Sequence, residues 1–343
     1  MIDKTLFGTT KDGKDVDMYR LNNANGNYVE ILNYGCRIRG IYVKDSQNVL
    51  RNVCLNYEDV TGYENDSSFI GAAVGRFGNR IANAQFEIDG VQYFVTKNEK
   101  ENHLHGGNQY FGNVVWKVRV EGDKLICNKR FLDGEEGYPG DLDVEITYEF
   151  TDENRLIIQY EATTSKDTIL NLTNHAYFNL SGDKTQSILD HKIMIATDCI
   201  TPVDEKQIPT GEIVSVFGTP FDFTRLQTIG DCMDLDNEQL RIGKGYDINY
   251  AFGSSSMKKM AVLQCDKTGI SMTCYSDQPG MQFYSGNNLD GDIDNKTGFE
   301  RYAALCLETQ NYPDAVHHDN FPSPILRKNE TYQTTTIYAF DTM

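Results

Sequence analysis

Apolar and polar residues alternate one by one through much of this chain. Residues 143–150 alternate strictly, and much of 155–163 and 332–340 follows the same pattern. Since successive side chains of a strand point to opposite faces, these segments are predicted to be strands. Residues 86–93 add two short strands joined by an Asp-Gly turn, a dipeptide that favours a tight hairpin.

Helical periodicity is scarce by comparison. Residues 57–63 and 235–240 could form short helical turns, but no segment sustains helical spacing for four turns. The chain shows no repeat of fixed period and no linker rich in proline, serine or one sign of charge. We therefore expect an all-β protein in which residues 1–343 form a single domain, a large antiparallel β-sandwich with few short helices.

A lone carboxylate stands inside the apolar segment 303–310, which is also predicted to be a strand. On that strand Glu308 shares a face with Cys306, whereas Leu305 and Leu307 lie on the other face. A part-buried carboxylate would have a raised pKa and be a better base near neutrality. Glu308 is therefore a candidate catalytic base, although a buried, ion-paired glutamate fits the same pattern.

Segment 171–180 supplies a counterpart to Glu308. With a period of two, one face carries hydrogen-bonding side chains that include His175 and Tyr177, and the other face is largely apolar. Such a row of polar groups suits a hydroxyl-rich ligand. We interpret His175 and Glu308 as an acid–base pair, and a hydrogen-bonded core histidine is the alternative for His175.

Arg80 and Asp247 are further candidates for contacts with such a ligand. Arg80 lies in the glycine-punctuated segment 75–81, which lacks the spacing of a phosphate-binding loop. Its guanidinium would donate to sugar hydroxyls or orient a carboxylate, or else form an ion pair at the end of a strand. Asp247 comes two residues after a glycine, where it would accept hydroxyl protons or simply belong to a turn.

The other histidines give weaker signals. His105 is in segment 102–107, whose two glycines would let a ligand approach the backbone. The H-x-H spacing there suits a metal, but no third ligand follows nearby, so we expect no metal site. His191 and the pair His317 and His318 are interpreted as surface residues.

Composition limits the class of ligand and the cellular compartment that we expect. The 343 residues carry a formal charge of -18, which repels nucleic acids and anionic membranes, so a neutral small molecule is the expected ligand. The eight cysteines show no C-x-x-C pair and no metal-ligand spacing, and free thiols fit a reducing compartment. Without an apolar leader or a run near the roughly 20 apolar residues of a membrane span, we expect a cytoplasmic protein. The sequence does not separate a monomer from a homodimer.

Several segments together resemble the aldose 1-epimerase, or galactose mutarotase, family. They follow the family's order between about residues 35 and 340, which is nearly the whole chain. The matching segments are 75–93, 102–107, 133–140, 171–180, 201–205, 282–287 and 307–310. The resemblance implies a galactose mutarotase-like supersandwich whose open cleft binds a free aldose, without a cofactor or a metal.

The resemblance also implies roles for individual residues. Glu308 would be the general base and His175 the general acid of ring opening and closing, which interconverts the α and β anomers of galactose or glucose. The positions that match the family's sugar-binding residues are Asn79, Arg80, His105, Asp247 and Gln282, with Tyr177 beside the acid. Ile248 stands where the family often has a histidine, a departure that would alter sugar preference at the cleft rim.

Three other functions remain open at this point. A glycosidase would need two carboxylates, whereas the partner of Glu308 is a histidine. A hexose-6-phosphate 1-epimerase would need a basic pocket, for which the sequence offers only Arg76 and Arg80. A non-catalytic sugar-binding protein would keep Arg80 and Asp247 without needing the acid–base pair. The sequence does not rank galactose against glucose or other aldoses.

Overall fold

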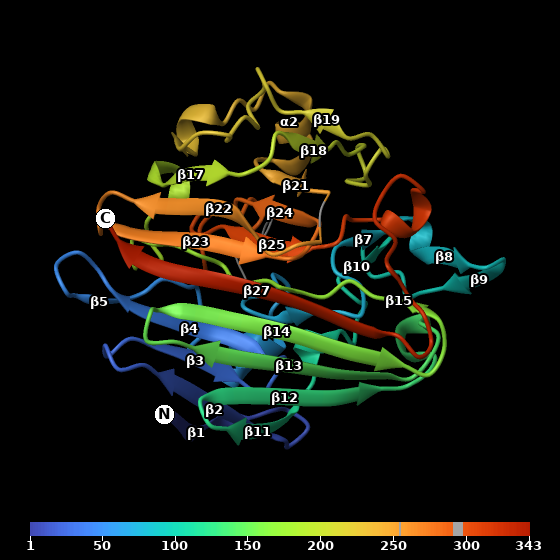
Figure 1. Cartoon of the computed structure of the whole chain (residues 1–343), viewed down its shortest axis with the longest axis horizontal. Coiled ribbons are helices and arrows are strands. Elements are labelled where there is room, and N and C mark those ends of the chain that lie inside the picture. Colours follow the sequence, from blue (N-terminus) through green and yellow to red (C-terminus); the bar gives the residue numbers. More distant parts are fainter. Residues whose placement is uncertain (254, 291–297) are drawn as a thin grey trace.

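The regular secondary structure is mostly antiparallel strands (Figure 1), and the computed structural model describes residues 1–253, 255–290 and 298–343. The largest sheet has nine strands and crosses the front of the view in Figure 1. In spatial order its strands are β11 (Lys117–Glu121), β12 (Lys124–Phe131), β13 (Leu142–Phe150), β14 (Arg155–Thr164), β27 (Thr331–Thr342), β23 (Ile270–Ser276), β22 (Lys258–Cys265), β17 (Lys192–Ile195) and β20 (Gln227–Thr228).

Two five-stranded sheets accompany it. The first consists of β1 (Ile2–Thr9), β2 (Asp15–Asn22), β3 (Tyr28–Leu32), β4 (Arg37–Lys44) and β5 (Leu50–Asn52). The second has the spatial order β19 (Val214–Ser215), β18 (Cys199–Thr201), β21 (Asp247–Ala251), β24 (Gly280–Tyr284) and β25 (Cys306–Gln310). This second sheet positions two of the predicted site residues, because Asp247 begins β21 and Glu308 is the middle residue of β25.

Short strand pairs and helices complete the described part of the chain. The two-stranded pairs are β7 (Arg80–Ile81) with β10 (His103–Leu104), β6 (Ala73–Val74) with β16 (Thr173–Asn174), β8 (Gln85–Ile88) with β9 (Val91–Phe94), and β15 (Thr168–Ile169) with β26 (Ile325–Leu326). The α-helices are α1 (Val60–Glu64) and α2 (Glu238–Gly243). Both overlap the segments for which helical turns are predicted, and β8 and β9 form the predicted hairpin.

The nine-stranded sheet shares one apolar core with both five-stranded sheets. A single cluster of buried side chains includes Ile146 of β13, Ile31 of β3 and Phe283 of β24. Two tyrosines also bridge the layers: the Tyr148 hydroxyl donates to the main-chain oxygen of Cys36 at 2.7 Å, and the Tyr338 hydroxyl to that of Leu307 at 2.8 Å. Sheets that pack face to face over a common core confirm the predicted antiparallel β-sandwich.

The two strands that carry the predicted acid and base differ from expectation in different ways. Segment 303–310 contains β25, so its prediction is confirmed, and Glu308 is fully rather than partly buried. Within segment 171–180 only β16 is a regular strand, and every side chain of the segment is buried. The prediction of a long strand with one wet face was therefore wrong. The segment runs through the interior, where the side-chain amides of Asn171 and Asn179 bond to main-chain oxygens of other loops.

All eight cysteines are free, as their spacing predicts. Within the described ranges, no helix combines the length and apolarity needed to cross a membrane.

Candidate active site

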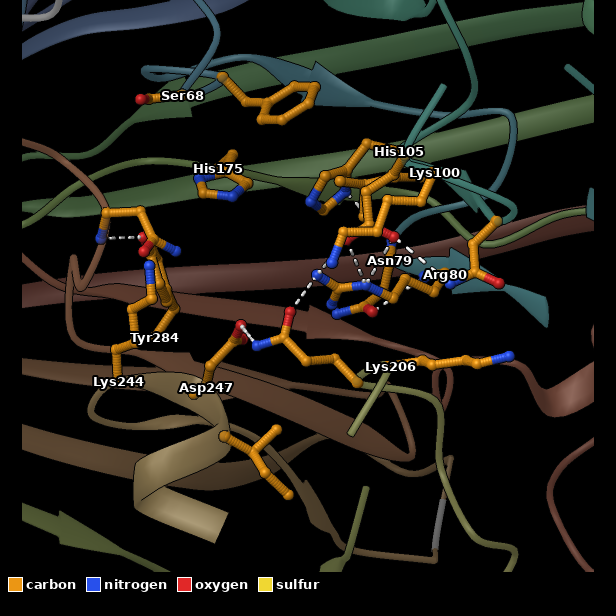
Figure 2. A pocket seen from close by; sticks show the side chains of 18 of the residues that line it. Ser68, Asn79, Arg80, Lys100, His105, His175, Lys206, Lys244, Asp247 and Tyr284 are labelled. Atoms are coloured by element: carbon orange, nitrogen blue, oxygen red, sulfur yellow. Dashed lines mark hydrogen bonds and ion pairs between the residues drawn. The ribbon is translucent and has the colours of Figure 1, made fainter. Parts of the chain in front are cut away.

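An open cleft of about 510 Å³ gathers the predicted site residues (Figure 2). A pocket of this size suits a small molecule. Seven of the eight residues predicted for the site line it: Asn79, Arg80, His105, His175, Tyr177, Asp247 and Glu308. Gln282 does not line the cleft itself, but its side-chain amide donates to Asp247 Oδ1 at 2.7 Å and supports that carboxylate.

His175 and Glu308 meet at the floor of the cleft. His175 Nε2 lies 3.7 Å from Glu308 Oε1, and the two side chains are buried, with 5% and 3% of their surface exposed. The second carboxylate oxygen, Glu308 Oε2, is buried and has no hydrogen-bond partner. An unpartnered acceptor of this kind is available to a hydroxyl hydrogen of a bound ligand.

Main-chain hydrogen bonds hold both Glu308 and His175 in place. Glu308 is paired with Gln282 across the β24–β25 ladder. His175 directly follows β16, and its main chain bonds on both sides, donating to Ala72 at 2.9 Å and accepting from Gly71 at 3.0 Å. Because both residues sit on bonded backbone rather than on exposed loops, the 3.7 Å gap is set by the fold itself.

Burial favours the neutral form of each member of the pair. It lowers the pKa of His175 to about 3. Burial, reinforced by the nearby Asp247 carboxylate, raises the pKa of Glu308 well above its usual range. A protonated Glu308 beside a neutral His175 holds the same single proton as an ionised Glu308 beside a charged His175, so the two groups titrate as one unit.

Three neighbours fix the His175 ring. Cys306 Sγ lies 3.4 Å from Nδ1, on the side of the ring away from Glu308. The Phe69 ring stacks on the imidazole with centroids 5.7 Å apart, and the Tyr177 ring lies at 5.0 Å. Phe69 also contacts His105 at 4.6 Å, so one aromatic side chain packs against both histidines of the cleft. Sequence reasoning missed Phe69, because a single aromatic residue in a loop carries no periodic signal.

His105 presents an N–H to the cleft. The main-chain N–H of Asn79 donates to His105 Nδ1 at 3.1 Å, so the ring proton of neutral His105 is on Nε2. Burial lowers the pKa of His105 well below its usual value, and the nearby His175 acts in the same direction. His105 is therefore a neutral donor suited to a sugar oxygen.

The same hydrogen bond bears on metal binding. One ligand atom each from His105, His175 and Glu308 lie within 4.8 Å of one another, so the fold supplies the third ligand that the sequence spacing lacks. A metal needs a ring lone pair, yet Nδ1 of His105 accepts from Asn79 and Nε2 carries the proton. The trio fits an acid–base site better than a metal site.

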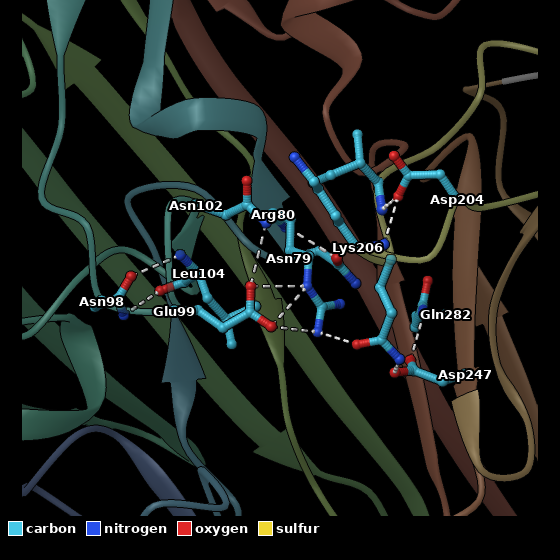
Figure 3. A network of polar contacts seen from close by, with 12 residues as sticks. Asn79, Arg80, Asn98, Glu99, Asn102, Leu104, Asp204, Lys206, Asp247 and Gln282 are labelled. Atoms are coloured by element: carbon cyan, nitrogen blue, oxygen red, sulfur yellow. Dashed lines mark hydrogen bonds and ion pairs between the residues drawn. The ribbon is translucent and has the colours of Figure 1, made fainter. Parts of the chain in front are cut away.

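Arg80 and Asp247 belong to one polar network (Figure 3). Arg80 Nη2 lies 3.1 Å from Glu99 Oε1 and donates to Gln207 Oε1 at 2.5 Å. Gln207 Nε2 in turn donates to Asp247 Oδ2 at 3.4 Å. Arg80 thus combines both sequence-based interpretations, an ion pair at a strand and a cleft-lining donor. Glu99 and Gln207 were not predicted, since they lie on loops whose meeting depends on the tertiary fold.

The distribution of cations differs from the expectation for a phosphate pocket. Arg76 does not face the cleft: it is buried, and its Nη1 donates to the main-chain oxygens of Pro139 and Gly140 at 2.9 Å. Instead Lys100, Lys206 and Lys244 line the cleft. Carboxylates stand among them, because Glu99, Glu101 and Glu205 line the same cleft. The rim is therefore mixed in charge.

Two peripheral predictions need correction. Ile248 belongs to the apolar core rather than the cleft rim. It follows Asp247 directly in β21, and adjacent side chains of a strand point to opposite faces of the sheet. His191 is not a surface residue either: it is 2% exposed, and its Nε2 accepts from the main-chain N–H of Leu180 at 2.9 Å.

The remaining pair of histidines lies near the surface, as predicted. His317 is exposed and His318 is half-buried. Both lie beside the buried Asp314 carboxylate, with His317 Nδ1 at 2.6 Å from Asp314 Oδ1.

A large antiparallel β-sandwich whose polar cleft holds the His105 donor and a histidine–glutamate pair suits the binding or conversion of a small, hydroxyl-rich molecule. Comparison with known proteins narrows this class. A sequence model described as aldose 1-epimerase matches residues 17–339. Galactose mutarotase from Rattus norvegicus is 39% identical over 343 residues, covering 99% of this chain and 98% of that protein. Aldose 1-epimerase from Escherichia coli is 34% identical, with 96% of each chain covered.

Solved structures agree with the sequence matches. The galactose 1-epimerase structure from Lactobacillus acidophilus superposes with a TM-score of 0.88 at 26% identity, covering 100% of this chain and 99% of that chain. The chain belongs to the aldose 1-epimerase family.

Proposed function

We propose that Glu308 and His175 catalyse the interconversion of the α and β anomers of free aldohexoses such as galactose and glucose. Family membership makes the chain an isomerase of aldoses. The observation that carries the assignment to these two residues is the buried pair itself, in which His175 Nε2 and Glu308 Oε1 lie 3.7 Å apart on the cleft floor. Two groups that exchange protons must both reach the reacting end of one sugar.

The two directions of pKa shift suit the two roles. Mutarotation requires a proton to leave the C1 hydroxyl while another reaches the ring oxygen. Ionised Glu308 takes the first, and Nε2 of protonated His175 supplies the second, so the C1–ring oxygen bond breaks and the open-chain aldehyde forms. Because burial lowers the pKa of His175 and raises that of Glu308, the charged His175 is a strong acid and the ionised Glu308 a strong base.

The return half of the reaction regenerates the enzyme. Rotation about the C1–C2 bond presents the other face of the carbonyl. Glu308 then returns its proton to the C1 oxygen while His175 recovers a proton from the hydroxyl that closes the ring. Proton count and electron count are unchanged after one turnover, so the cycle needs no further reactant.

The rest of the cleft would hold the sugar while C1 turns. Neutral His105 offers its Nε2–H, Arg80 offers guanidinium N–H groups, and Asp247 offers carboxylate oxygens. Asn79 fixes the His105 tautomer through its main chain. Gln282 orients Asp247, which supports a role in sugar binding through that carboxylate rather than by lining the cleft.

Polarimetry tests the proposal directly. Fresh α-D-galactose and α-D-glucose are followed with the wild-type protein and with Glu308→Gln and His175→Asn, after circular dichroism has shown that the variants fold. Both assignments are supported if the wild type accelerates mutarotation and each of the two substitutions abolishes that acceleration. If the wild type accelerates neither sugar, while calorimetry detects sugar binding, the chain is a sugar-binding protein and the catalytic proposal fails.

A sugar phosphate is the second candidate substrate, and the lysines of the cleft are the observation that favours it. Lys100, Lys206 and Lys244 line the cleft, although Lys206 is paired with Glu101. Glucose 6-phosphate in the same assay decides the matter. A kcat/KM for glucose 6-phosphate well above that for glucose, and its fall on Lys100→Ala, would reassign the substrate.

We further infer that the chain works as a single domain in a reducing compartment such as the cytoplasm. The main core cluster contains residues from Tyr19 to Phe340, and the cysteines are unpaired.

A further inference from the structure

The side chain of Gln207 joins two groups that are proposed to bind the sugar. Its Oε1 accepts from Arg80 Nη2 at 2.5 Å, and its Nε2 donates to Asp247 Oδ2 at 3.4 Å. Gln207 thereby bridges a guanidinium and a carboxylate that both line the cleft.

Gln207 accepts one hydrogen bond and donates the other, as a sugar hydroxyl in the same place would. A hydroxyl is both a donor and an acceptor, so between Arg80 and Asp247 it would accept from the guanidinium and donate to the carboxylate. The amide of Gln207 makes the same pair of contacts. Bonds to charged partners are the stronger class of hydrogen bond, so the amide and a substrate hydroxyl would compete for the same partners.

Gln207 also borders a small recess next to the cleft, as Asn79, Arg80 and Asp247 do. It lines both spaces, and the recess, about 10 Å³, is bordered as well by Asn249 and Gln282. Asn249 Oδ1 and Gln282 Oε1 are buried acceptors without a hydrogen-bond partner, and their side chains are 2% and 4% exposed. The recess therefore favours a hydrogen-bond donor and has room for about one water or one hydroxyl.

The turn that carries Gln207 is held by bonds that do not involve its side chain. Asp204 Oδ1 accepts from the main-chain N–H groups of Lys206 at 2.8 Å and Ile208 at 3.0 Å. Gln239 clamps Val203 from the other side, accepting from its N–H at 2.8 Å and donating to its C=O at 2.9 Å. The backbone can stay in place while the Gln207 side chain swings away.

We propose that Gln207 occupies the place of a substrate hydroxyl between Arg80 and Asp247, and that a bound aldose displaces its side chain. This inference rests on the proposed aldose substrate. Gln207 is then a specificity-determining residue, because only an aldose with a hydroxyl at this place can replace both of its bonds. An aldose without that hydroxyl binds with the Gln207 bridge intact.

The test uses Gln207→Ala and a series of deoxy sugars. Removing the competing amide should lower the KM for galactose roughly three- to tenfold, the range expected for one or two lost hydrogen bonds, with little change in kcat. The 2-, 3-, 4- and 6-deoxygalactoses then locate the hydroxyl. For the analogue that lacks it, Gln207→Ala should leave KM unchanged, whereas the other analogues should show the same fall as galactose.

Gln239→Ala is the matched control, since it loosens the same turn without removing the bridge. An unchanged or raised KM for galactose in Gln207→Ala would overturn the proposal, as would an equal fall of KM in Gln239→Ala. A binding measurement separates this test from catalysis. Calorimetry gives the affinity for 1,5-anhydrogalactitol, which lacks the reacting C1 hydroxyl and therefore binds without being converted. Tighter binding to Gln207→Ala than to the wild type supports the displacement even if polarimetry shows no turnover, and equal or weaker binding counts against it.

Discussion

His175 Nε2 lies 3.7 Å from Glu308 Oε1, and both side chains are nearly inaccessible to solvent. Placing an imidazole and a carboxylate this close in a poorly hydrated site couples their titrations. The pair has one proton to share, and the position of that proton decides whether the pair is neutral or charge-separated. The following predictions depend on that coupling.

Single and double substitutions of the pair should show that the two residues act in one process. Glu308→Gln and His175→Asn should each lower kcat about 10²–10⁴-fold, the usual contribution of a general acid or base, with a smaller effect on KM. The double variant should be nearly as active as the worse single variant, because either loss already interrupts the proton exchange. Steady-state polarimetry with galactose measures all three.

The control for this series is Glu153→Gln, which changes an exposed carboxylate in the turn between β13 and β14 and should leave kcat unaltered. Losses that multiply in the double variant would mean that Glu308 and His175 act independently.

The pH dependence of kcat should follow the proton count of the pair. On the acidic side activity falls when the pair takes up a second proton, and the burial that lowers the pKa of His175 to about 3 places this limb well below neutrality. On the alkaline side activity falls when the shared proton leaves, and burial of Glu308 moves this limb above the ordinary carboxyl range because it raises the pKa.

Most titratable groups around the pair keep one charge state near neutrality, and Asp247 is the carboxyl whose titration could overlap the profile. Burial raises the pKa values of Cys306, Tyr177 and Tyr284 above their usual values and lowers that of His105, so these groups stay neutral near pH 7. Burial also raises the pKa of Asp247, although Arg80 opposes this. Initial rates, corrected for spontaneous mutarotation, give the profile. An acidic limb near 6.5, the ordinary pKa of histidine, would contradict a pair whose histidine is held neutral by burial.

Cys306 should matter through the orientation of His175. Its Sγ lies 3.4 Å from Nδ1, and burial raises its pKa, so it is a neutral thiol that can either donate to Nδ1 or accept from it. Cys306→Ala should lower kcat roughly two- to tenfold with KM unchanged, the effect of losing one weak hydrogen bond. The ¹⁵N spectrum of His175 should shift toward a mixture of tautomers.

Cys306→Ser separates orientation from packing, because serine keeps a donor and acceptor in a smaller side chain. It should restore part of the lost kcat and one dominant tautomer. If Cys306→Ala changes thermal stability but neither kcat nor the ¹⁵N spectrum, the thiol is only a packing residue.

The sequence predicted the fold class and seven of the residues that line the cleft, but not the neighbours that surround them. Strict alternation in β13 and β14 gave correct strands, because each has one face in the core and one face toward solvent. Segment 171–180 misled for the opposite reason: it is buried on all sides, and its alternating polar residues bond to loops instead of water. Its period of two was real, but it did not mark a wetted strand.

Contacts between loops were beyond sequence reasoning. Gln207 lies 127 residues from Arg80, and only the fold brings their side chains together. Phe69 and Glu99 are likewise placed by tertiary packing. Family resemblance implied eight site residues, of which all but Gln282 line the cleft, and it gave no information about the side chains that position them.

The burial of Glu308 should also lower the stability of the protein as pH rises. A carboxyl whose pKa is higher in the folded state than in the unfolded chain binds more protons when folded, so its contribution is present below the unfolded value, about 4.3, and is lost as pH rises through the folded value. The amide introduced by Glu308→Gln cannot titrate. Thermal unfolding of wild type and Glu308→Gln at pH 4 to 8 should therefore give a Tm difference that grows with pH in favour of the variant, whereas Glu153→Gln should show no such trend. A Tm difference independent of pH would mean that Glu308 keeps its ordinary carboxyl pKa in the folded protein, and the one-proton pair would then lose its physical basis.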